Sequence, residues 1–142
     1  MVEIGGEIRA RGQRQLGRDW DLAIETPSFE PGELVTRVRV SGKGLTTSGD
    51  YRAYFEKGGQ RFSHTIDPRT GAPVTHNLAS ISVVAASAAE ADGWDTALMV
   101  LGPEAGRRLA REQKIAAFMI LRQGSGFVTE AIGGFETCLV KP

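Results

Sequence analysis

The sequence predicts a single α+β domain over residues 1–142, in which an antiparallel sheet carries helices packed on one face. Stretches with strand-like alternation come first, a stretch with helical spacing of apolar residues follows, and short apolar stretches end the chain. This order of strands, two helices and strands is typical of α+β domains. The 18 glycines suit a sheet with many tight turns. A chain of 142 residues with 41% hydrophobic content can form one core.

The N-terminal stretches predict three strands. Residues 2–11 alternate around the Gly5-Gly6 pair, which is typical of one strand. The glycines within it indicate either a bulge, the more frequent reason, or room for a ligand against the backbone. Residues 20–25 and 34–40 also alternate, and the turn residues between them predict that these two strands pair.

The next two segments predict a loop and a hairpin. Residues 41–50, with the sequence SGKGLTTSGD, are too rich in glycine and hydroxyl side chains for a core element, so we expect a polar loop that can belong to a site. Residues 51–66 indicate a hairpin with its turn at Gly58-Gly59. The returning strand of this hairpin leads to His64.

A polar turn follows the hairpin. His64, Asp67 and Arg69 lie close together in the sequence, and the prolines and glycine around them restrict or free the backbone. A histidine at a strand end is ordinarily a hydrogen-bonded structural residue, but in a site it can act as a general base. We expect Asp67 and Arg69 to serve as turn and ion-pair residues rather than as catalysts.

The helical region has a well-defined start. Ser87 and Glu90 form the S-x-x-E pattern, in which the hydroxyl caps one end amide and the glutamate reaches back to another. Gly102-Pro103 is expected to end this helix. A second helix is predicted from residue 104 to about residue 114.

Apolar strands flank the helices. Residues 78–86 are β-branched and largely apolar, as expected for a central strand covered on both faces. Residues 116–121 predict another apolar strand. Residues 127–131 and 136–140 predict two short strands on either side of a glycine pair.

Asp92 and Thr96 form a candidate cation site. Their spacing of four residues places a carboxylate and a hydroxyl on one helix face, near the positive end of the helix dipole. Oxygen ligands suit a hard cation, and a cation beside helix amides favours a phosphate-bearing ligand. The alternative is a structural role, because an aspartate and a threonine early in a helix usually cap it or face solvent.

Composition excludes several function classes. Lys+Arg and Asp+Glu are equal at 17 each, so a basic face for nucleic acid is not expected. The lone Cys138 cannot form an intrachain disulfide and is expected to be a small core residue. No apolar run approaches a transmembrane segment, and the first residues lack the pattern of a signal peptide, so we expect a soluble chain.

Four separated motifs carry a resemblance to a known family. GGEIRARG, TTSGDY, SHTIDPRTGAP and AEADGWDTALMVLGPE occur in this order over nearly the whole chain. Together they closely resemble the C-terminal portion of the FAD:protein FMN transferases, the ApbE flavin transferases. The resemblance implies that the family's N-terminal half has no counterpart within these 142 residues.

The resemblance implies a magnesium-dependent transfer of FMN from FAD to a threonine hydroxyl of an acceptor protein, with release of AMP. It implies Mg²⁺ as cofactor, FAD as substrate, an acceptor flavoprotein and the missing N-terminal half as partners, and a fold similar to the tunnelling-fold architecture. The alternatives are a pyrophosphatase that splits FAD into FMN and AMP, and a fragment that binds flavin or serves structure without catalysis. Family members usually act in the periplasm or cell envelope, in association with the membrane.

The resemblance also assigns site residues. Asp92 and Thr96 match the metal ligands, and His64 matches a histidine at the flavin diphosphate that is the candidate general base. The segments that match the lining of the flavin site are Gly5, Gly6 and Glu7, and Ser48, Gly49 and Asp50.

Two residues depart from the family pattern. Gly93 stands where the family usually has alanine, which weakens the helix by about 1 kcal/mol. Asp95 adds a carboxylate beside Thr96, where we expect it to be able to compete for the metal.

Overall fold

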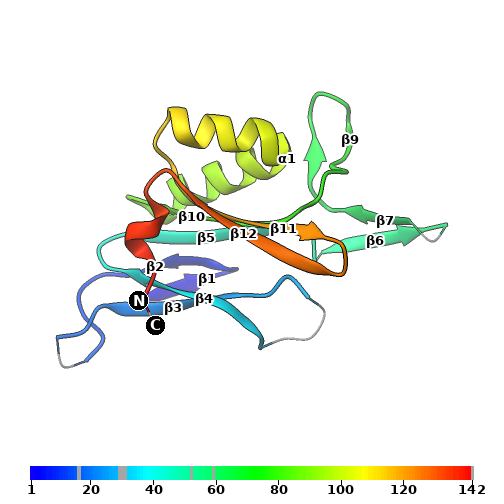
Figure 1. Cartoon of the computed structure of the whole chain (residues 1–142). Coiled ribbons are helices and arrows are strands. Elements are labelled where there is room, and N and C mark those ends of the chain that lie inside the picture. Colours follow the sequence, from blue (N-terminus) through cyan, green and yellow to red (C-terminus); the bar gives the residue numbers. More distant parts are fainter. Residues whose placement is uncertain (16, 29–31, 52, 59, 142) are drawn as a thin grey trace.

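The computed structural model describes residues 1–15, 17–28, 32–51, 53–58 and 60–141. Its centre is a six-stranded antiparallel sheet with the strand order β1-β2-β5-β10-β11-β12 (Figure 1). The strands are β1 Val2–Ile4, β2 Glu7–Arg9, β5 Gly44–Gly49, β10 Leu78–Ala85, β11 Ala116–Gln123 and β12 Gly126–Ile132. The helix α1 lies on one face of this sheet, so the predicted fold class is confirmed.

Helix α1, Ala88–Glu112, begins and breaks where the sequence predicts. The Ser87 hydroxyl accepts a hydrogen bond of 3.1 Å from the backbone amide of Glu90, which caps the first turn. Gly102 has the non-helical angles φ 76° and ψ −180°, and Pro103 follows it. The two predicted helices are therefore the two segments of α1 on either side of this kink. Within the described residues, no helix is long and apolar enough to cross a membrane.

His76 explains the position of the kink. Its Nδ1 accepts a hydrogen bond from the Leu78 amide at 3.3 Å, so Nε2 carries the proton and donates to the Met99 carbonyl at 2.7 Å. That bond satisfies a carbonyl at the end of the first helical segment. A Cβ atom at Gly102 would lie 2.6 Å from the His76 ring, so the chain turns away from the helix at a residue without a side chain.

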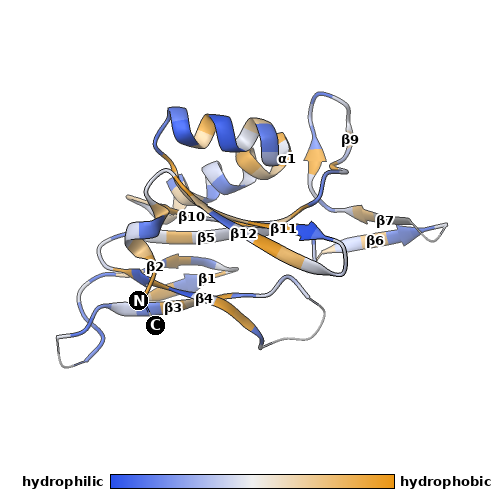
Figure 2. Cartoon of the chain, in the orientation of Figure 1, coloured by the Kyte–Doolittle hydropathy of each residue, from blue (hydrophilic) through white to orange (hydrophobic). Residues whose placement is uncertain are grey.

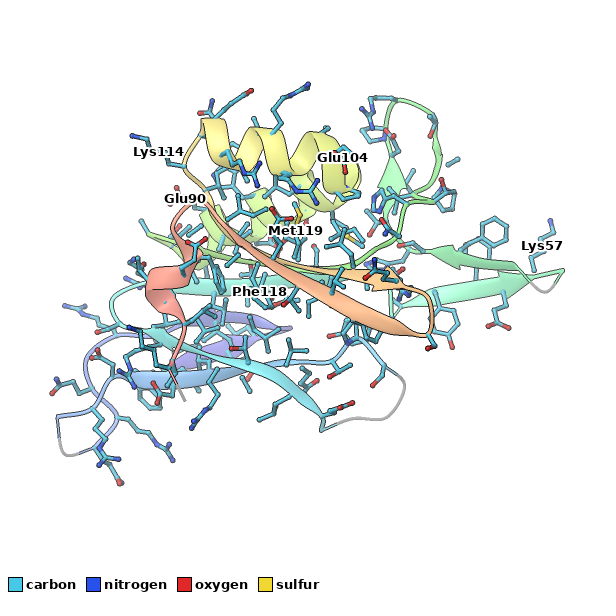
Figure 3. The ribbon with its side chains drawn as sticks, in the orientation of Figure 1. Lys57, Glu90, Glu104, Lys114, Phe118 and Met119 are labelled. Carbon is cyan, nitrogen blue, oxygen red and sulfur yellow. The ribbon has the colours of Figure 1, made fainter. Side chains whose placement is uncertain are left out.

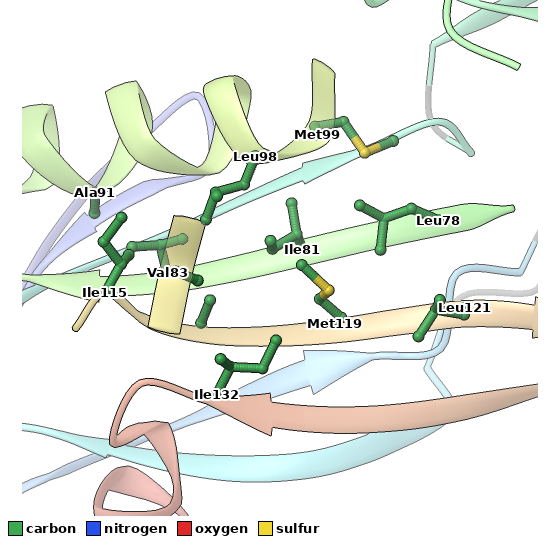
Figure 4. Close-up of a cluster of buried hydrophobic side chains, with 12 residues drawn as sticks. Leu78, Ile81, Val83, Ala91, Leu98, Met99, Ile115, Met119, Leu121 and Ile132 are labelled. Carbon is green, nitrogen blue, oxygen red and sulfur yellow. The ribbon is translucent and has the colours of Figure 1, made fainter. Parts of the chain in front are cut away.

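The sheet is buried on both faces. Hydrophobic residues are frequent along the strands of the sheet (Figure 2). Alternate side chains of the central strands enter one of two hydrophobic cores, as the neighbours Phe118 and Met119 show (Figure 3). The core beneath α1 (Figure 4) consists of Leu78, Ile81, Val83, Ala91, Leu98, Met99, Ala110, Ile115, Ala117, Met119, Leu121 and Ile132. The core on the opposite face consists of Ala10, Ile24, Val38, Val40, Leu45, Val84, Phe118, Ile120, Phe135 and Cys138.

The second face is covered by a separate hairpin. β3, Trp20–Glu25, pairs with β4, Leu34–Val40, which confirms the predicted pairing. Figure 1 shows this hairpin on the side of the sheet away from α1. Cys138 is buried there, as expected.

Two further hairpins lie beyond the main sheet. β6, Tyr54–Lys57, pairs with β7, Gln60–Ser63, which confirms the expected hairpin in a shorter form. Gly58 lies in its turn, whereas Gly59 is outside the described residues. β8, Ile66–Asp67, pairs with β9, Ala72–Pro73, around the polar turn.

The prediction of one N-terminal strand is wrong. β1 and β2 form a tight hairpin in which Ile4 pairs with Glu7. Gly5 and Gly6 form its two-residue turn, with φ angles of 69° and 111°. Positive φ at both central residues matches the twist of the flanking strands, so the glycine pair reverses the chain instead of bulging a strand.

The prediction of a polar loop at residues 41–50 is also wrong. Residues 44–49 form β5, which pairs with β2 on one side and with β10 on the other. Leu45 and Thr46 are buried. Two hydroxyl side chains of this strand have hydrogen-bond partners, Thr47 with Ser82 at 2.7 Å and Ser48 with Asp95 at 3.0 Å, whereas the buried Thr46 hydroxyl has none within hydrogen-bond geometry among the described residues.

The strand predicted at residues 136–140 is a 3₁₀ helix instead. The helix η1 spans Phe135–Cys138, and of the predicted strand only Leu139 forms an isolated bridge, with Val38. Burial of Phe135, which stacks on Phe118 with ring centroids 5.4 Å apart, holds this turn against the sheet.

Candidate functional site

The polar cluster of the candidate site forms where α1 crosses β5. The Ser48 hydroxyl donates to Asp95 Oδ1 at 3.0 Å, and the Thr96 hydroxyl donates to the same oxygen at 3.2 Å. The Ser48 and Thr96 hydroxyl oxygens lie 3.4 Å apart. Residues separated by almost fifty positions in the sequence thus meet, because β5 lies in the sheet directly beneath the helix.

Asp92 and Thr96 lie on the exposed flank of α1. Both side chains are exposed, and the hydroxyl oxygen of the half-buried Ser48 lies 3.4 Å from that of Thr96. Among the described residues, no group of three or more His, Cys, Asp or Glu side chains could hold a metal ion. The oxygen atoms that could bind a cation here are the Asp92 carboxylate and the hydroxyls of Ser48 and Thr96. This set of ligands fits Mg²⁺ if the remaining ligands come from a phosphate and water.

Asp95 is turned away from solvent. It is 1% exposed, and burial raises its pKa to about 6. The hydroxyl groups of Thr46, Ser48 and Thr96 oppose this rise, and the charge of Asp92 adds to it. The expectation that Asp95 competes for the metal stays a prediction, because its buried Oδ1 lies only 3.2 Å from the hydroxyl oxygen of the candidate ligand Thr96.

Sequence reasoning missed this burial, although a signal was present. Asp95 lies four residues after Ala91 and three before Leu98, and both of these residues belong to the core beneath α1. That spacing places it on the inward face of the helix. The contrary signal was its charge, which is rare at a buried position.

The Ser48-Gly49-Asp50 segment lies at the end of β5, and its members have different surroundings. Ser48 belongs to the polar cluster. Gly49 faces the Tyr51 ring, which a Cβ atom would approach to 2.6 Å. Asp50 forms a bidentate ion pair with Arg122 of β11 at 2.6 and 2.7 Å. The sequence did not identify Arg122 as a partner.

The Gly5-Gly6-Glu7 turn and Ser48 lie toward the same end of the paired strands β2 and β5. β2 runs antiparallel to β5, with Ile8 opposite Leu45. The turn, which precedes Ile8, therefore lies in the same direction along the sheet as Ser48, which follows Leu45. β2 also contacts α1. The three predicted flavin-lining residues of this turn therefore belong to the same region as the polar cluster.

His64 follows β7 and is exposed. Its Nδ1 lies 2.7 Å from the Ala53 carbonyl, which can only accept, so Nδ1 carries the proton and Nε2 keeps a lone pair. This tautomer suits a general base. The hydrogen bonds described for His64 remain within its own hairpin, while β8, just after it, contacts α1.

Asp67 and Arg69 form the expected turn and ion pair. Arg69 Nη2 lies 2.7 Å from Asp67 Oδ2, and the Arg69 amide donates to Asp67 Oδ1 at 2.9 Å. These bonds to Arg69 lower the pKa of Asp67 to about 2. Both residues thus hold the turn that follows His64.

The fold and the cluster define an α+β domain with an oxygen-rich polar site between a helix and a sheet. The chain belongs to the ApbE family, whose model matches residues 1–119. The FAD:protein FMN transferase of Klebsiella pneumoniae (strain 342) is 46% identical over 140 residues, which are 99% of this chain and 40% of the relative. The enzyme of the same name from Escherichia coli (strain K12) is 43% identical over the same share of each chain.

Solved structures agree with this assignment. The apo form of the Pseudomonas stutzeri flavinyl transferase ApbE is 46% identical, with a TM-score of 0.81 over 96% of this chain and 42% of that one. The flavin transferase ApbE from Vibrio cholerae is 40% identical, with a TM-score of 0.84 over 98% and 44%. The chain thus spans about two fifths of the length of the relatives that it matches.

Proposed function

We propose that this chain supplies the metal-bearing part of a Mg²⁺-dependent FAD:protein FMN transferase, which moves FMN from FAD to a threonine hydroxyl of an acceptor protein and releases AMP. The observation that carries the proposal is the pair of hydroxyl oxygens from Ser48 and Thr96, 3.4 Å apart at the junction of β5 and α1, with Asp92 one helical turn before Thr96, within a chain of the ApbE family. A cation held by such oxygen atoms can neutralise charge on a diphosphate.

Each residue has a proposed role. Asp92 and Thr96 hold Mg²⁺, which when bound neutralises charge on the FAD diphosphate. His64 accepts the proton of the acceptor threonine at Nε2, the nitrogen that its bond to Ala53 leaves unprotonated. The threonine oxygen then bonds to the FMN phosphorus, the bond from that phosphorus to the bridging oxygen breaks, and AMP leaves with that oxygen.

The diphosphate, the flavin and water complete the site. Two protein side chains are too few for the near-octahedral coordination of Mg²⁺. We propose that the diphosphate, water and the family's N-terminal half provide the other ligands, and that the Gly5-Gly6-Glu7 turn and the Ser48-Gly49-Asp50 segment line the flavin site. We therefore expect the 142 residues alone to bind Mg²⁺ weakly.

The test distinguishes FMN transfer, FAD hydrolysis and the absence of catalysis. The chain, and the product of the full reading frame that encodes it, are mixed with FAD and Mg²⁺, with and without a threonine-containing acceptor peptide. AMP together with a flavin-labelled peptide supports transfer, and AMP without labelled peptide supports FAD hydrolysis. No AMP under any of these conditions contradicts both reactions and supports a non-catalytic flavin-binding fragment.

We also propose that the protein acts in the periplasm or cell envelope, associated with the membrane. This proposal rests on the family resemblance alone. The full reading frame should encode an export signal or lipid anchor, and its product should fractionate with the envelope. A cytoplasmic product without either signal would contradict the proposal.

A further inference from the structure

Asp95 is the only charged side chain among the buried residues that the structure describes. Burying a carboxylate is costly unless hydrogen bonds compensate for lost water. Here two hydroxyl groups do so, from Ser48 on β5 and from Thr96 on the next position of α1. The resemblance to the family assigns no role to this position.

The hydrogen-bond directions follow from the chemistry of the groups. An ionised carboxylate has no hydrogen, so both hydroxyls must donate to Asp95 Oδ1. Each hydroxyl has a single hydrogen. The remaining lone pairs of Ser48 and Thr96 are therefore free to act as acceptors or ligands, on two oxygens that lie 3.4 Å apart.

This arrangement is the one that a cation ligand requires. A hydroxyl coordinates a hard cation through a lone pair, and its hydrogen must point elsewhere. A negative charge directly behind the ligating oxygen also increases its electron density, as hydrogen-bonded partners of metal ligands do in general.

We propose that Asp95 is a positioning residue, which takes the hydroxyl hydrogens of Ser48 and Thr96 and thereby orients both oxygens as ligands beside Asp92. The inference rests on the proposed function, because it assumes that a cation binds at Asp92 and Thr96. It adds Ser48 as a third oxygen ligand from the protein and assigns Asp95 to the support of the site rather than to direct contact with the metal.

The experiment measures Mn²⁺ affinity by electron paramagnetic resonance in the product of the full reading frame. Asp95→Asn keeps the size of the side chain and removes its charge, and we expect Mn²⁺ binding to weaken roughly 10–100-fold. Ser48→Ala removes one of the oriented hydroxyls and should also weaken binding. Glu90→Gln is the matched control, since it removes an exposed charge from the start of the same helix and should leave Mn²⁺ affinity unchanged.

A double variant separates orientation from simple stabilisation. If Asp95 acts through Ser48, the effects of Asp95→Asn and Ser48→Ala on Mn²⁺ affinity should sum to more than the effect of the double variant. Thermal unfolding, followed by circular dichroism, reports whether each variant is folded. Ser48→Ala keeps the buried carboxylate paired with Thr96, so it serves as the test if Asp95→Asn does not fold.

The outcomes distinguish this inference from the proposed function. Parental Mn²⁺ affinity in both folded Asp95→Asn and folded Ser48→Ala, with binding lost in Asp92→Asn, would overturn the role of Asp95 and leave the cation site intact. Parental affinity in Asp92→Asn would instead overturn the cation site itself, and the inference with it.

Discussion

Asp92 is the residue on which the cation site depends most directly. In the active full-length form, Asp92→Ala should nearly abolish AMP release, because it removes the charged ligand. The side chain is exposed, so the fold should remain intact and the free energy of unfolding should barely change. Steady-state AMP release and urea unfolding measure the two effects.

The ordinary interpretation of Asp92 as a capping or surface residue predicts the reverse. Loss of a capping interaction costs roughly 0.5–2 kcal/mol of stability and does not affect turnover. An Asp92→Ala enzyme that requires the same magnesium concentration as its parent would contradict the metal site.

His64 has a role that is separable from metal binding. A general base contributes typically 10²–10⁴-fold to a rate, so His64→Ala should lower turnover by about that factor. The magnesium affinity should stay the same, since His64 bonds to Ala53 and not to the metal cluster. A variant with normal turnover would remove His64 from the mechanism.

Asp95 makes stability depend on pH when the metal is chelated. Burial raises its folded-state pKa to about 6 from an ordinary value of 3.8, so between these pH values the folded state binds more protons than the unfolded state. The free energy of unfolding should therefore fall as pH rises through this range. In Asp95→Asn that part of the slope should be absent. Urea unfolding from pH 4 to pH 7 in EDTA measures both slopes, and identical slopes would contradict the raised pKa.

At the scale of elements, two glycines of α1 offer a matched comparison. Gly102→Ala places a Cβ 2.6 Å from the His76 ring at a φ of 76°, so we expect a loss of more than about 1 kcal/mol of stability. Gly93→Ala lies within the helix, with no atom within 4 Å of the added Cβ, and should gain up to about 1 kcal/mol. Chemical denaturation measures both, and a stabilised Gly102→Ala would show that the kink tolerates a side chain.

At the scale of the whole molecule, the β1 edge is the most exposed apolar part of the described sheet. Val2 and Ile4 point to one face of β1 and are 60% and 74% exposed, and the described sheet pairs β1 only with β2. Such an edge tends to recruit another strand. We expect the 142-residue chain to self-associate at high concentration and Ile4→Lys to reduce this association.

Sedimentation velocity measures the association. Leu34→Lys is the control, because Leu34 is 53% exposed on the separate β3–β4 hairpin and its replacement should leave the association unchanged. A parent chain that stays monomeric at high concentration would contradict the role of the β1 edge.

The sequence by itself determined the elements whose signals are local. The start of α1 follows from Ser87 and the Glu90 amide three residues away, and its break follows from Gly102-Pro103. The strand β10 follows from a largely apolar segment with the β-branched residues Ile81, Val83 and Val84, which is typical of a strand covered on both faces. In each case the residues that decide the structure are neighbours along the chain, so periodicity and capping chemistry are sufficient to predict it.

Only the tertiary structure decided what distant segments do to one another. The composition of residues 44–49 is typical of a loop, but in the fold β2 and β10 supply hydrogen-bond partners on both sides, so the segment is a strand. From the sequence, Asp95 is expected to be a surface carboxylate, but in the fold it is buried beneath the helix and accepts a hydrogen bond from Ser48, 47 positions away. Pairing and burial depend on which surfaces meet, and those contacts contribute free energy only after the chain has folded, so local patterns cannot report them.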